Sequence, residues 1–429
     1  MSEIKNKLSL EPYKGTRDFY PKEQFVQNYI FSVWKKVCES YGYLEYNASI
    51  LEETELYKSK SGEEIVNEQT YSFTDRGGRN VTIRPEMTPT VARMVAQKRK
   101  ELTFPLRWFS VPNLFRYERP QRGRLREHWQ LNADMFGVDG MEADVEVISL
   151  AHSIMKGFGA KDSDFNIRIS NRKLTTFLLK EFFRLDEDKT YKVFKLIDKM
   201  KKLPESEFKE ALEKVVGEIF EELYKTLKSE NLESLNQEVL NSEGGKQVKE
   251  LFEKLNKLGI NNLVFDFSIV RGFDYYTGTV FEVYDTSPEN NRALFGGGRY
   301  DDLVGIFGVE KVPGIGFGMG DVTMRDFLET HALMPEYKPA VKLYICHLEG
   351  CLDAASSLGS YLRELGINVS VDLTNRKVSL QVKAADREKI PYVLVVGEEE
   401  VKTGKFKVKN LKDSSEIEVE KEKIVELIK

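Results

Sequence analysis

The chain is poor in the residues that build disulfide frameworks and metal sites. Its 429 residues include three cysteines and four histidines. Three cysteines give no disulfide framework, and no histidine stands at metal-binding spacing from a cysteine, so we expect no structural zinc site. The scarcity of cysteine favours a reducing, cytoplasmic location.

Long apolar runs are also missing. No stretch approaches the roughly 20 residues that a membrane span needs, and the start MSEIKNKLSL is too polar for a secretory signal. With 41% hydrophobic and 31% charged residues, the composition is that of a soluble protein with several domains. We expect no membrane partner.

The common phosphate-binding motifs are absent as well. There is no G-x-x-x-x-G-K-[ST] loop, and residues 296–298 (GGG) lack the spacing of a dinucleotide-binding turn. Residues 115–130, FRYERPQRGRLREHWQ, instead carry five arginines in a chain of net charge -5. Arginine binds phosphate through two parallel hydrogen bonds and stays charged. The segment predicts either a solvated basic hairpin or a phosphate-binding loop, with its turn at residues 120–123.

Periodicity predicts helices at residues 23–41 and throughout the Lys/Glu-rich residues 172–258. The inward faces are expected to hold Phe25, Tyr29, Val33, Val37 and Tyr41 in the first helix, and Phe208, Leu212, Val215, Ile219 and Leu223 in the second region.

Alternating apolar residues predict strands. A hairpin is expected at residues 69–88, strands at 107–118 and 127–137, and further strands between 262 and 320. After a plausible linker, PEYKPA, the pattern is βαβαβ, which predicts a small sheet domain of parallel type.

Four of these segments carry polar groups in apolar surroundings: TIRPEMT, QLNAD, VRGFDYYTG and GFGMGD. Each alone has an ordinary explanation, such as a pair between Glu86 and Arg84, or Tyr275 and Tyr276 as core aromatics. Together they predict a pocket with carboxylates for an amino group, arginines for a phosphate or carboxylate, and tyrosines for a ring. The glycines allow a ligand to approach the backbone closely.

These motifs resemble those of the histidyl-tRNA synthetases, a family of class II aminoacyl-tRNA synthetases. The resemblance spans nearly the whole chain and is carried by GTRDFYP (15–21), RPEMT (84–88), FRYERPQRGRLREHWQLNADMFG (115–137, similar to motif 2), VRGFDYYTGTVFEVY (270–284, similar to the histidine-specific segment) and FGGGRYDDLVG (295–305).

The resemblance implies an α+β fold. We expect a class II catalytic domain, with an antiparallel six-stranded sheet and flanking helices, at residues 1–171 and 259–334. A helical insertion is expected at 172–258 and a C-terminal α/β anticodon-binding domain at 339–429. The family also implies a homodimer formed through the first helix and the strand after it.

The implied activity is the ATP-dependent ligation of L-histidine to tRNA(His) through a histidyl-adenylate. Mg²⁺ is expected to be held mainly by the ATP phosphates, without a metal site in the protein. For ATP, the resemblance assigns Arg116 and Arg271 to the α-phosphate, Glu118 to the adenine amino group, and Arg124 or Arg126 to the pyrophosphate.

The amino acid and the tRNA have their own expected contacts. For histidine, the resemblance assigns Glu86 and Thr88 to the amino group, Gln130 to the carboxylate, and Asp134 and Tyr276, with Tyr275 nearby, to the imidazole. Arg119 and Arg122, closer to the loop tip, are expected to contact the tRNA acceptor end.

The chain departs from the family pattern at three points. Asp134 stands where many bacterial members have glutamate, and Ser49 stands for the motif 1 proline. Motif 3 usually ends in Glu-Arg, but Thr323 occupies the place of the arginine that covers adenine. Asp321 predicts the N-cap of a helix on which Arg325 points away from Thr323.

Two other functions fit parts of the pattern. One is an inactive paralogue serving as the histidine-sensing regulatory subunit of ATP phosphoribosyltransferase, and the other is an RNA-binding scaffold. Such subunits usually lack the anticodon domain and the arginine–tyrosine segment, both of which are present here. RNA binding alone requires no amino-acid pocket.

Overall fold

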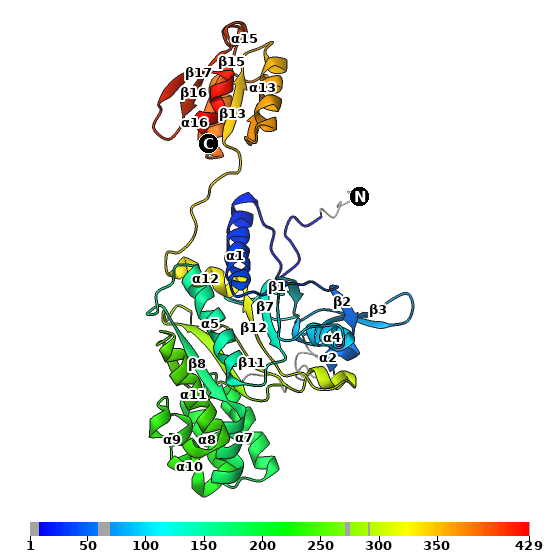
Figure 1. Cartoon of the computed structure of the whole chain (residues 1–429), viewed down its shortest axis with the longest axis vertical. Coiled ribbons are helices and arrows are strands. Elements are labelled where there is room, and N and C mark those ends of the chain that lie inside the picture. Colours follow the sequence, from blue (N-terminus) through cyan, green and yellow to red (C-terminus); the bar gives the residue numbers. More distant parts are fainter. Residues whose placement is uncertain (1–7, 59–68, 271–274, 291, 429) are drawn as a thin grey trace, which may run out of the picture. The chain divides into compact units, whose positions relative to one another are not determined.

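Strands from both halves of the first 335 residues join in one sheet (Figure 1). The structure is a computed structural model that describes residues 8–58, 69–270, 275–290 and 292–428. Within these residues the sheet has nine strands: β1 (Leu44–Glu45), β5 (Leu106–Ser110), β6 (Asn113–Phe115), β7 (Glu127–Phe136), β8 (Phe165–Asn171), β9 (Leu263–Phe265), β10 (Thr279–Asp285), β11 (Ala293–Arg299) and β12 (Gly314–Gly320).

Six of the strands are antiparallel to their neighbours, in the order β5-β7-β12-β11-β10-β8. This confirms the expected six-stranded sheet. The short strands β1 and β9 extend its edges in parallel pairing, and β6 pairs with one end of β7. The strand predicted over residues 107–118 is wrong as one piece, because Val111 and Pro112 separate β5 from β6 and a proline cannot donate to the ladder.

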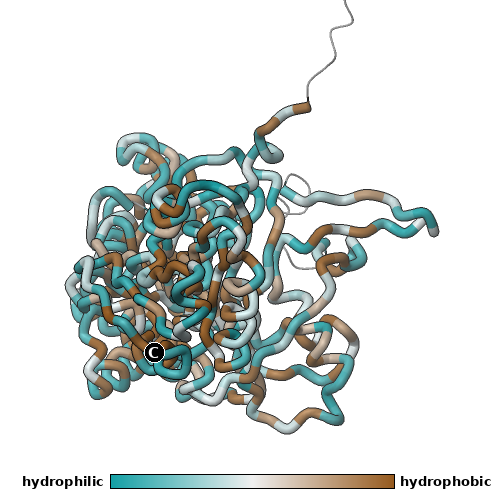
Figure 2. The backbone as a smooth tube through the Cα atoms, turned by 90° about the horizontal axis from the view of Figure 1, so that it is seen from above, coloured by the Kyte–Doolittle hydropathy of each residue, from teal (hydrophilic) through white to brown (hydrophobic). Residues whose placement is uncertain are grey.

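The predicted hairpin is present as β3 (Tyr71–Thr74) and β4 (Asn80–Ile83), which pair with β2 (Leu51–Glu53) in a second, small sheet. The Asp75 carboxylate accepts hydrogen bonds from the backbone N–H groups of Gly77 and Arg79 and so closes the turn. The hairpin projects from the molecule, and its turn is hydrophilic (Figures 1 and 2).

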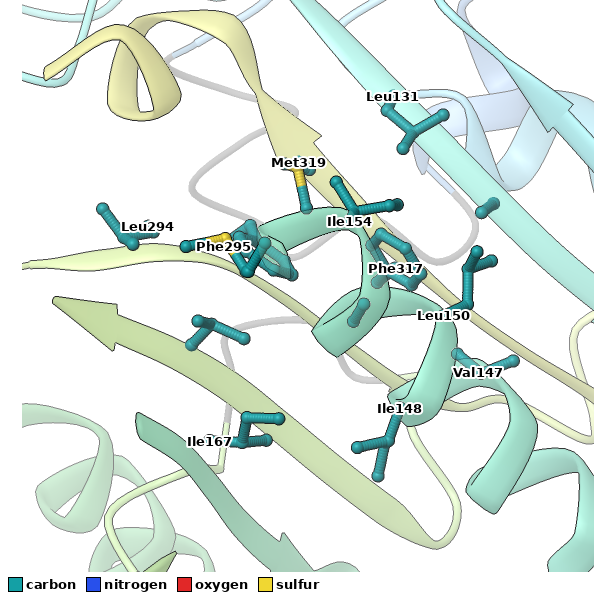
Figure 3. Packing of buried hydrophobic residues seen from close by; sticks show 14 of the residues in the cluster. Leu131, Val147, Ile148, Leu150, Ile154, Ile167, Leu294, Phe295, Phe317 and Met319 are labelled. Carbon is teal, nitrogen blue, oxygen red and sulfur yellow. The ribbon is translucent and has the colours of Figure 1, made fainter. Parts of the chain in front are cut away.

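Helices cover one face of the nine-stranded sheet. They are α1 (Pro21–Ser40), α5 (Met141–Gly157) and α12 (Asp321–Thr330). Val147, Leu150 and Ile154 of α5 recur at helical spacing and pack with Phe317 and Met319 of β12 (Figure 3). This layer is the hydrophobic core of the catalytic region.

Helix α1 forms where it was predicted, but its innermost face lies one residue further along. Val26, Ile30, Trp34 and Cys38 are buried, whereas the predicted row beginning with Phe25 is half-buried at the edge of the core. One residue is a rotation of about 100° on a helix. Both rows of α1 are apolar, so the sequence pattern alone does not distinguish the row that is buried at the centre from the row at its edge.

Two further helices, α2 (Glu55–Lys58) and α4 (Thr88–Lys98), flank the small sheet. Between β8 and β9 the chain is helical: α6 (Arg172–Phe177), a π-helical turn (Leu178–Phe182), α7 (Glu187–Lys199), α8 (Glu205–Val216), α9 (Phe220–Leu227), α10 (Gln237–Asn241) and α11 (Glu243–Lys257). The predicted apolar row from Phe208 to Leu223 does not lie on one helix. Gly217 has a positive φ of 64° and ends α8, so Val215 and Ile219 are only half-buried.

Residues after Pro335 form a separate compact unit. It has the predicted βαβαβ order: β13 (Leu343–His347), α13 (Leu352–Glu364), β14 (Val369–Val371), α14 (Val378–Arg387) and β15 (Tyr392–Val396). The three strands are parallel, in the order β14-β13-β15. An antiparallel hairpin, β16 (Lys405–Asn410) and β17 (Glu416–Glu420), extends the sheet, and two short helices, α15 (Glu398–Thr403) and α16 (Ile424–Ile428), complete the unit.

Candidate active site

Strand β7 places a row of polar side chains on the sheet face opposite the helices. Because successive side chains of a strand alternate, His128, Gln130, Asn132 and Asp134 share one face, while Leu131, Ala133 and Met135 face the core. The Gln130 amide donates to Asn132 Oδ1 at 2.8 Å. The two central members of the polar row are thus linked by a hydrogen bond.

The neighbouring strand β12 has glycine opposite three of these polar residues. Gly316, Gly318 and Gly320 stand opposite Asp134, Asn132 and Gln130. A Cβ atom on Gly318 would collide with the Gln130 amide, and one on Gly316 with the Asp134 carboxylate. The glycines therefore leave the space in which the side chains of β7 lie over β12.

A cluster of tyrosines and carboxyl groups lies at one end of the polar row. Tyr300, which follows β11, donates its hydroxyl hydrogen bond to Asp134 Oδ1. The Tyr275 ring is 4.9 Å from that of Tyr276 and 5.9 Å from that of Tyr300, centroid to centroid. The Tyr275 hydroxyl donates to Glu86 Oε2 at 3.3 Å.

Thr88 also lies near Tyr275: burial raises the pKa of the Tyr275 hydroxyl, and the Thr88 side chain acts in the opposite direction. Five residues of the predicted histidine site therefore form one contiguous group: Glu86, Thr88, Tyr275, Tyr276 and Asp134. They come from distant segments, since Glu86 and Tyr275 are 189 residues apart in the sequence. Gln130 lies on the same face of β7. The structure brings these predicted residues together.

Asp134 has an unusual environment. Its side chain is 3% exposed, and burial raises the pKa of its carboxyl group to about 7, while the hydrogen bond from Tyr300 acts in the opposite direction. Its Oδ2 atom is buried and has no hydrogen-bond partner among the residues that the structure describes. Buried acceptors without a partner are rare and costly, so this oxygen marks a place for a ligand donor.

The arginine-rich segment begins beside the cluster. Arg116 donates from Nε to the carbonyl of Pro85 at 2.8 Å, next to Glu86. Burial, together with the charges of Arg116 and Arg17, lowers the pKa of His128 to about 3. His128 is therefore neutral at physiological pH, and the positive charge at this end of the site belongs to arginine.

The other arginines of the segment have different surroundings. Arg124 pairs with Glu118 at 3.1 Å and is half-exposed. The Arg126 guanidinium lies 4.0 Å from the Tyr117 ring centroid and donates to the Tyr13 hydroxyl at 2.9 Å. Arg126 is therefore enclosed by aromatic side chains, whereas Arg124 remains open to solvent.

The two arginines nearest the turn also differ. Arg119 is exposed. Arg122 donates to Asn290 Oδ1 at 3.1 Å and so ties the loop tip to the connection between β10 and β11. Gly123, the next residue, lies against α12, where a Cβ atom on it would be 3.5 Å from the Thr323 methyl group.

The structure corrects the prediction that Asp321 is an N-cap. Gly320 is the N-cap, and Asp321 is the first residue of α12 with a wholly buried side chain. Its carboxylate accepts hydrogen bonds from Arg17 at 2.6 Å, from the Gln27 amide at 3.0 Å and from the Trp129 backbone N–H at 2.9 Å. Asp321 thus joins the GTRDFYP segment to β7, a long-range role that local sequence cannot reveal.

The remaining polar residues divide between structure and site. Arg84 does not pair with Glu86, since it donates to the carbonyls of Asn113 and Ala48 and holds loops together. Arg271 lies outside the described residues. Tyr300 and Asn132 were not singled out from the sequence. Asn132 lies between Gln130 and Asp134 on the polar face of β7, and this alternation could have found it. Tyr300 follows β11 and meets Asp134 only in the folded chain.

Neither a metal site nor a membrane span is found within the described part of the chain. No group of three or more His, Cys, Asp or Glu side chains there is arranged to hold a metal ion. None of the helices described is both long and apolar enough to cross a bilayer.

These features define a class II aminoacyl-tRNA synthetase: six antiparallel strands beside the arginine-rich segment, a helical insertion, and a separate C-terminal sheet unit. The family described as histidyl-tRNA synthetase matches residues 15–321, and an anticodon-binding domain matches residues 342–429. The chain therefore belongs to the histidyl-tRNA synthetase family.

Individual relatives agree with this assignment. The chain is 44% identical over 410 residues to the histidine–tRNA ligase of Leptospira biflexa, which covers 94% of each chain. It is 38% identical over 413 residues to that of Thermoplasma volcanium, with 94% of this chain and 95% of the relative covered. The solved histidyl-tRNA synthetase from Nostoc sp. PCC 7120 has the same fold, with a TM-score of 0.83 at 24% identity over 98% of this chain and 99% of that one.

Proposed function

We propose that the protein ligates L-histidine to tRNA(His) at the expense of ATP, through a histidyl-adenylate. The observation that carries this proposal is the cluster of Asp134, Tyr276, Tyr275 and Glu86, which lies beside Arg116 in a chain of this family. A pocket that pairs both ring nitrogens of histidine rejects similar side chains, because they would leave buried polar groups unsatisfied.

The cluster offers a group for each part of the amino acid. Glu86 and Thr88 bind the α-amino group, and Gln130 binds the carboxylate. Asp134 and Tyr276 face the two imidazole nitrogens, with Tyr275 packed beside them. Gln130 and Asp134 share one face of β7, and the two tyrosines and Glu86 cluster with Asp134 at its end, which supports the assignment.

Arginine stabilises the charge that develops in the first step. A carboxylate oxygen of histidine attacks the α-phosphorus of ATP, the bond to the bridging oxygen breaks, and pyrophosphate leaves. Arg116 and Arg271 bind the α-phosphate, which is electrostatic stabilisation by positioned donors. In the second step a hydroxyl of the terminal adenosine of the tRNA attacks the activated carbonyl and releases AMP.

Glu118 binds the adenine amino group, and Arg124 or Arg126 binds the leaving pyrophosphate. Arg124 is favoured, because Arg126 is enclosed by Tyr117 and Tyr13. Mg²⁺ accompanies ATP and is held mainly by the phosphates, which supply the oxygen ligands that this ion prefers. Arg119 and Arg122 lie nearest the loop tip and contact the acceptor end of the tRNA.

The C-terminal residues from about 339 to 429 bind the anticodon stem. Truncation near Pro335, the last residue of the first compact unit, should preserve histidine-dependent ATP–pyrophosphate exchange and reduce charging of tRNA. Unchanged charging by the truncated protein would remove this role.

A homodimer is proposed through α1 and β1. Leu44 on β1 is 67% exposed and Leu51 on β2 is 42% exposed, and a second subunit would cover such apolar side chains. Sedimentation analysis of the whole protein tests this assembly. We place the protein in the cytoplasm, in keeping with its three cysteines, which are buried free thiols.

Histidine-dependent exchange of pyrophosphate into ATP tests the activity. Arg271→Ala should slow adenylate formation by about 10²–10³, the usual loss for one donor of this kind. Exchange that proceeds equally with other amino acids, or without Arg271, would contradict the assignment. An inactive regulatory paralogue would bind histidine without any exchange.

A further inference from the structure

We propose that Tyr300 is a positioning residue for histidine: it holds one oxygen of Asp134 so that the other oxygen faces the imidazole N–H of the substrate. The inference rests on the proposed function and extends it to a residue outside the expected set of contacts. It concerns how the pocket fixes the orientation of its carboxylate.

Tyr300 is itself held firmly. It is 2% exposed, its backbone N–H donates to the Gly314 carbonyl at 2.7 Å, and its ring lies 6.0 Å from that of Phe136 and 5.9 Å from that of Tyr275, centroid to centroid. Its hydroxyl group therefore has a fixed position, from which it donates to Asp134 Oδ1.

Asp134 has room to accept one further donor. Gly316 lies directly opposite on β12, and a Cβ atom there would collide with Asp134 Oδ1 and lie 2.7 Å from the Tyr300 hydroxyl. The carboxylate thus lies against a bare strand, with Oδ1 bonded to Tyr300. Oδ2 is buried and has no partner among the described residues. An N–H donor of the bound ring would complete it.

Asp134 needs such support because its carboxylate is carried on a single methylene group. The last torsion of an aspartate side chain is broad, so the carboxylate rotates readily unless a hydrogen bond restrains it. Tyr300 supplies that restraint. Because the Tyr300 hydroxyl donates from a fixed position, it sets the orientation of the carboxylate before the ligand binds.

The charges around Asp134 set the direction of its response to pH. The charge of Asp134 acts on Tyr43, Tyr46 and Tyr300. The other ionisable groups around these tyrosines are Arg107 and Glu146 near Tyr43, Arg84 near Tyr46, and Tyr275, Tyr276 and Glu86 near Tyr300. Burial raises the pKa of Asp134 and the bond from Tyr300 lowers it. Loss of that bond therefore raises the pKa further, and the carboxylate becomes protonated at a higher pH.

Tyr300→Phe removes the hydroxyl group and keeps the ring. We expect the KM for histidine in the exchange assay to rise about 10- to 100-fold, as for a lost hydrogen bond to a charged group, with kcat changed only a few-fold. On acidification, the KM should begin to rise at a higher pH in Tyr300→Phe than in the wild type. The protonation of free histidine is common to both proteins and cancels in this comparison.

A double-mutant cycle separates positioning from packing. In an Asp134→Asn background, which has no carboxylate to orient, Tyr300→Phe should cause little further change. Tyr344→Phe is the matched control, because it removes a hydroxyl group that donates at 2.9 Å to the buried Asp372 of the C-terminal unit. It should leave histidine-dependent exchange unchanged.

The outcomes are distinct. A wild-type protein without histidine-dependent exchange would overturn the proposed function. An active wild type with a Tyr300→Phe variant of unchanged KM and pH profile, or with additive effects in the cycle, would overturn the role of Tyr300. Thermal melting verifies folding. Should Tyr300→Phe not fold, Gly316→Ala tests the same hydrogen bond, because its Cβ atom would lie 2.7 Å from the Tyr300 hydroxyl and collide with Asp134 Oδ1. The KM for histidine should then rise, and an unchanged KM in a folded Gly316→Ala variant would overturn the role of Tyr300.

Discussion

The two faces of the central sheet obey opposite rules, although they share the same strands. On the helix-covered face, β7 and β12 present Leu131, Phe317 and Met319, which pack in the core. On the other face, the same strands present Gln130, Asp134 and glycine. The first face is filled with apolar side chains that exclude water. On the second face, the glycines of β12 leave space for the polar side chains of β7 and for a ligand.

This difference shows how one sheet supplies both rigidity and chemistry. The apolar face fixes the register of the strands, because a slip of one residue would exchange the two faces. A fixed register then places Asp134 opposite Gly316 and Gln130 opposite Gly320. The positions of the polar side chains therefore depend on the packing of the apolar face.

The largest expected effect comes from breaking the apolar face. Phe317 is 4% exposed, and its ring lies 5.7 Å from that of Phe295 and 6.1 Å from that of Phe281. Phe317→Ala should leave a cavity and destabilise the protein by about 3–5 kcal/mol. We expect a clearly lower thermal midpoint, measured by circular dichroism, with a near-normal KM for histidine in the folded fraction. An unchanged midpoint would show that this face is less tightly packed than the structure indicates.

A pair of glycine substitutions separates the faces directly. On the polar face, the three atoms nearest to a Cβ atom on Gly318 all belong to the flexible Gln130 side chain. Gly318→Ala should therefore displace that amide and raise the KM for histidine about 10- to 100-fold with little loss of stability. On the apolar face, a Cβ atom on Gly297 collides with the backbone carbonyl of Gly316 and lies 2.6 Å from Phe317 Cα.

Gly297→Ala should therefore lower the thermal midpoint. Exchange kinetics and melting curves of the two variants test the contrast. Equal losses of stability in both would mean that the glycines of the polar face serve the fold rather than the site.

The sequence predicts the strands and the pocket residues because both depend on short-range patterns. Alternation gives β3, β4 and β7, and the motifs carry Glu86, Gln130, Asp134 and the tyrosine pair. What it misses depends on contacts between distant segments. The bond from Tyr300 to Asp134 spans 166 residues and the pair of Arg17 and Asp321 spans 304. Neither leaves a periodic signal, and a buried aspartate at a helix start has the same local sequence as an N-cap.

The arginine arm, the segment from Arg116 to Arg126 between β6 and β7, begins next to Glu86, and Arg124 tests its part in ATP binding. Arg124 pairs with Glu118, but it is half-exposed, so its guanidinium is accessible to a phosphate. Arg124→Ala should weaken ATP use in the exchange assay by roughly 1.5–3 kcal/mol, the value for a lost charge-assisted hydrogen bond. A KM for ATP equal to that of the wild type would assign the pyrophosphate to another arginine of the arm.

The smallest effect is expected at Arg325, the nearest arginine in sequence to the vacant motif 3 position. Thr323 occupies that position and donates to the Leu294 carbonyl at 2.7 Å, while Arg325 pairs with Glu329 one turn further along α12, at 3.1 Å. Such exposed pairs contribute only a few tenths of a kcal/mol. Arg325→Ala should therefore change the KM for ATP no more than a few-fold, measured beside Arg124→Ala under the same conditions. A larger loss in Arg325→Ala than in Arg124→Ala would mean that α12 supplies the missing charge, and that the nucleotide is bound from the helix rather than from the arm.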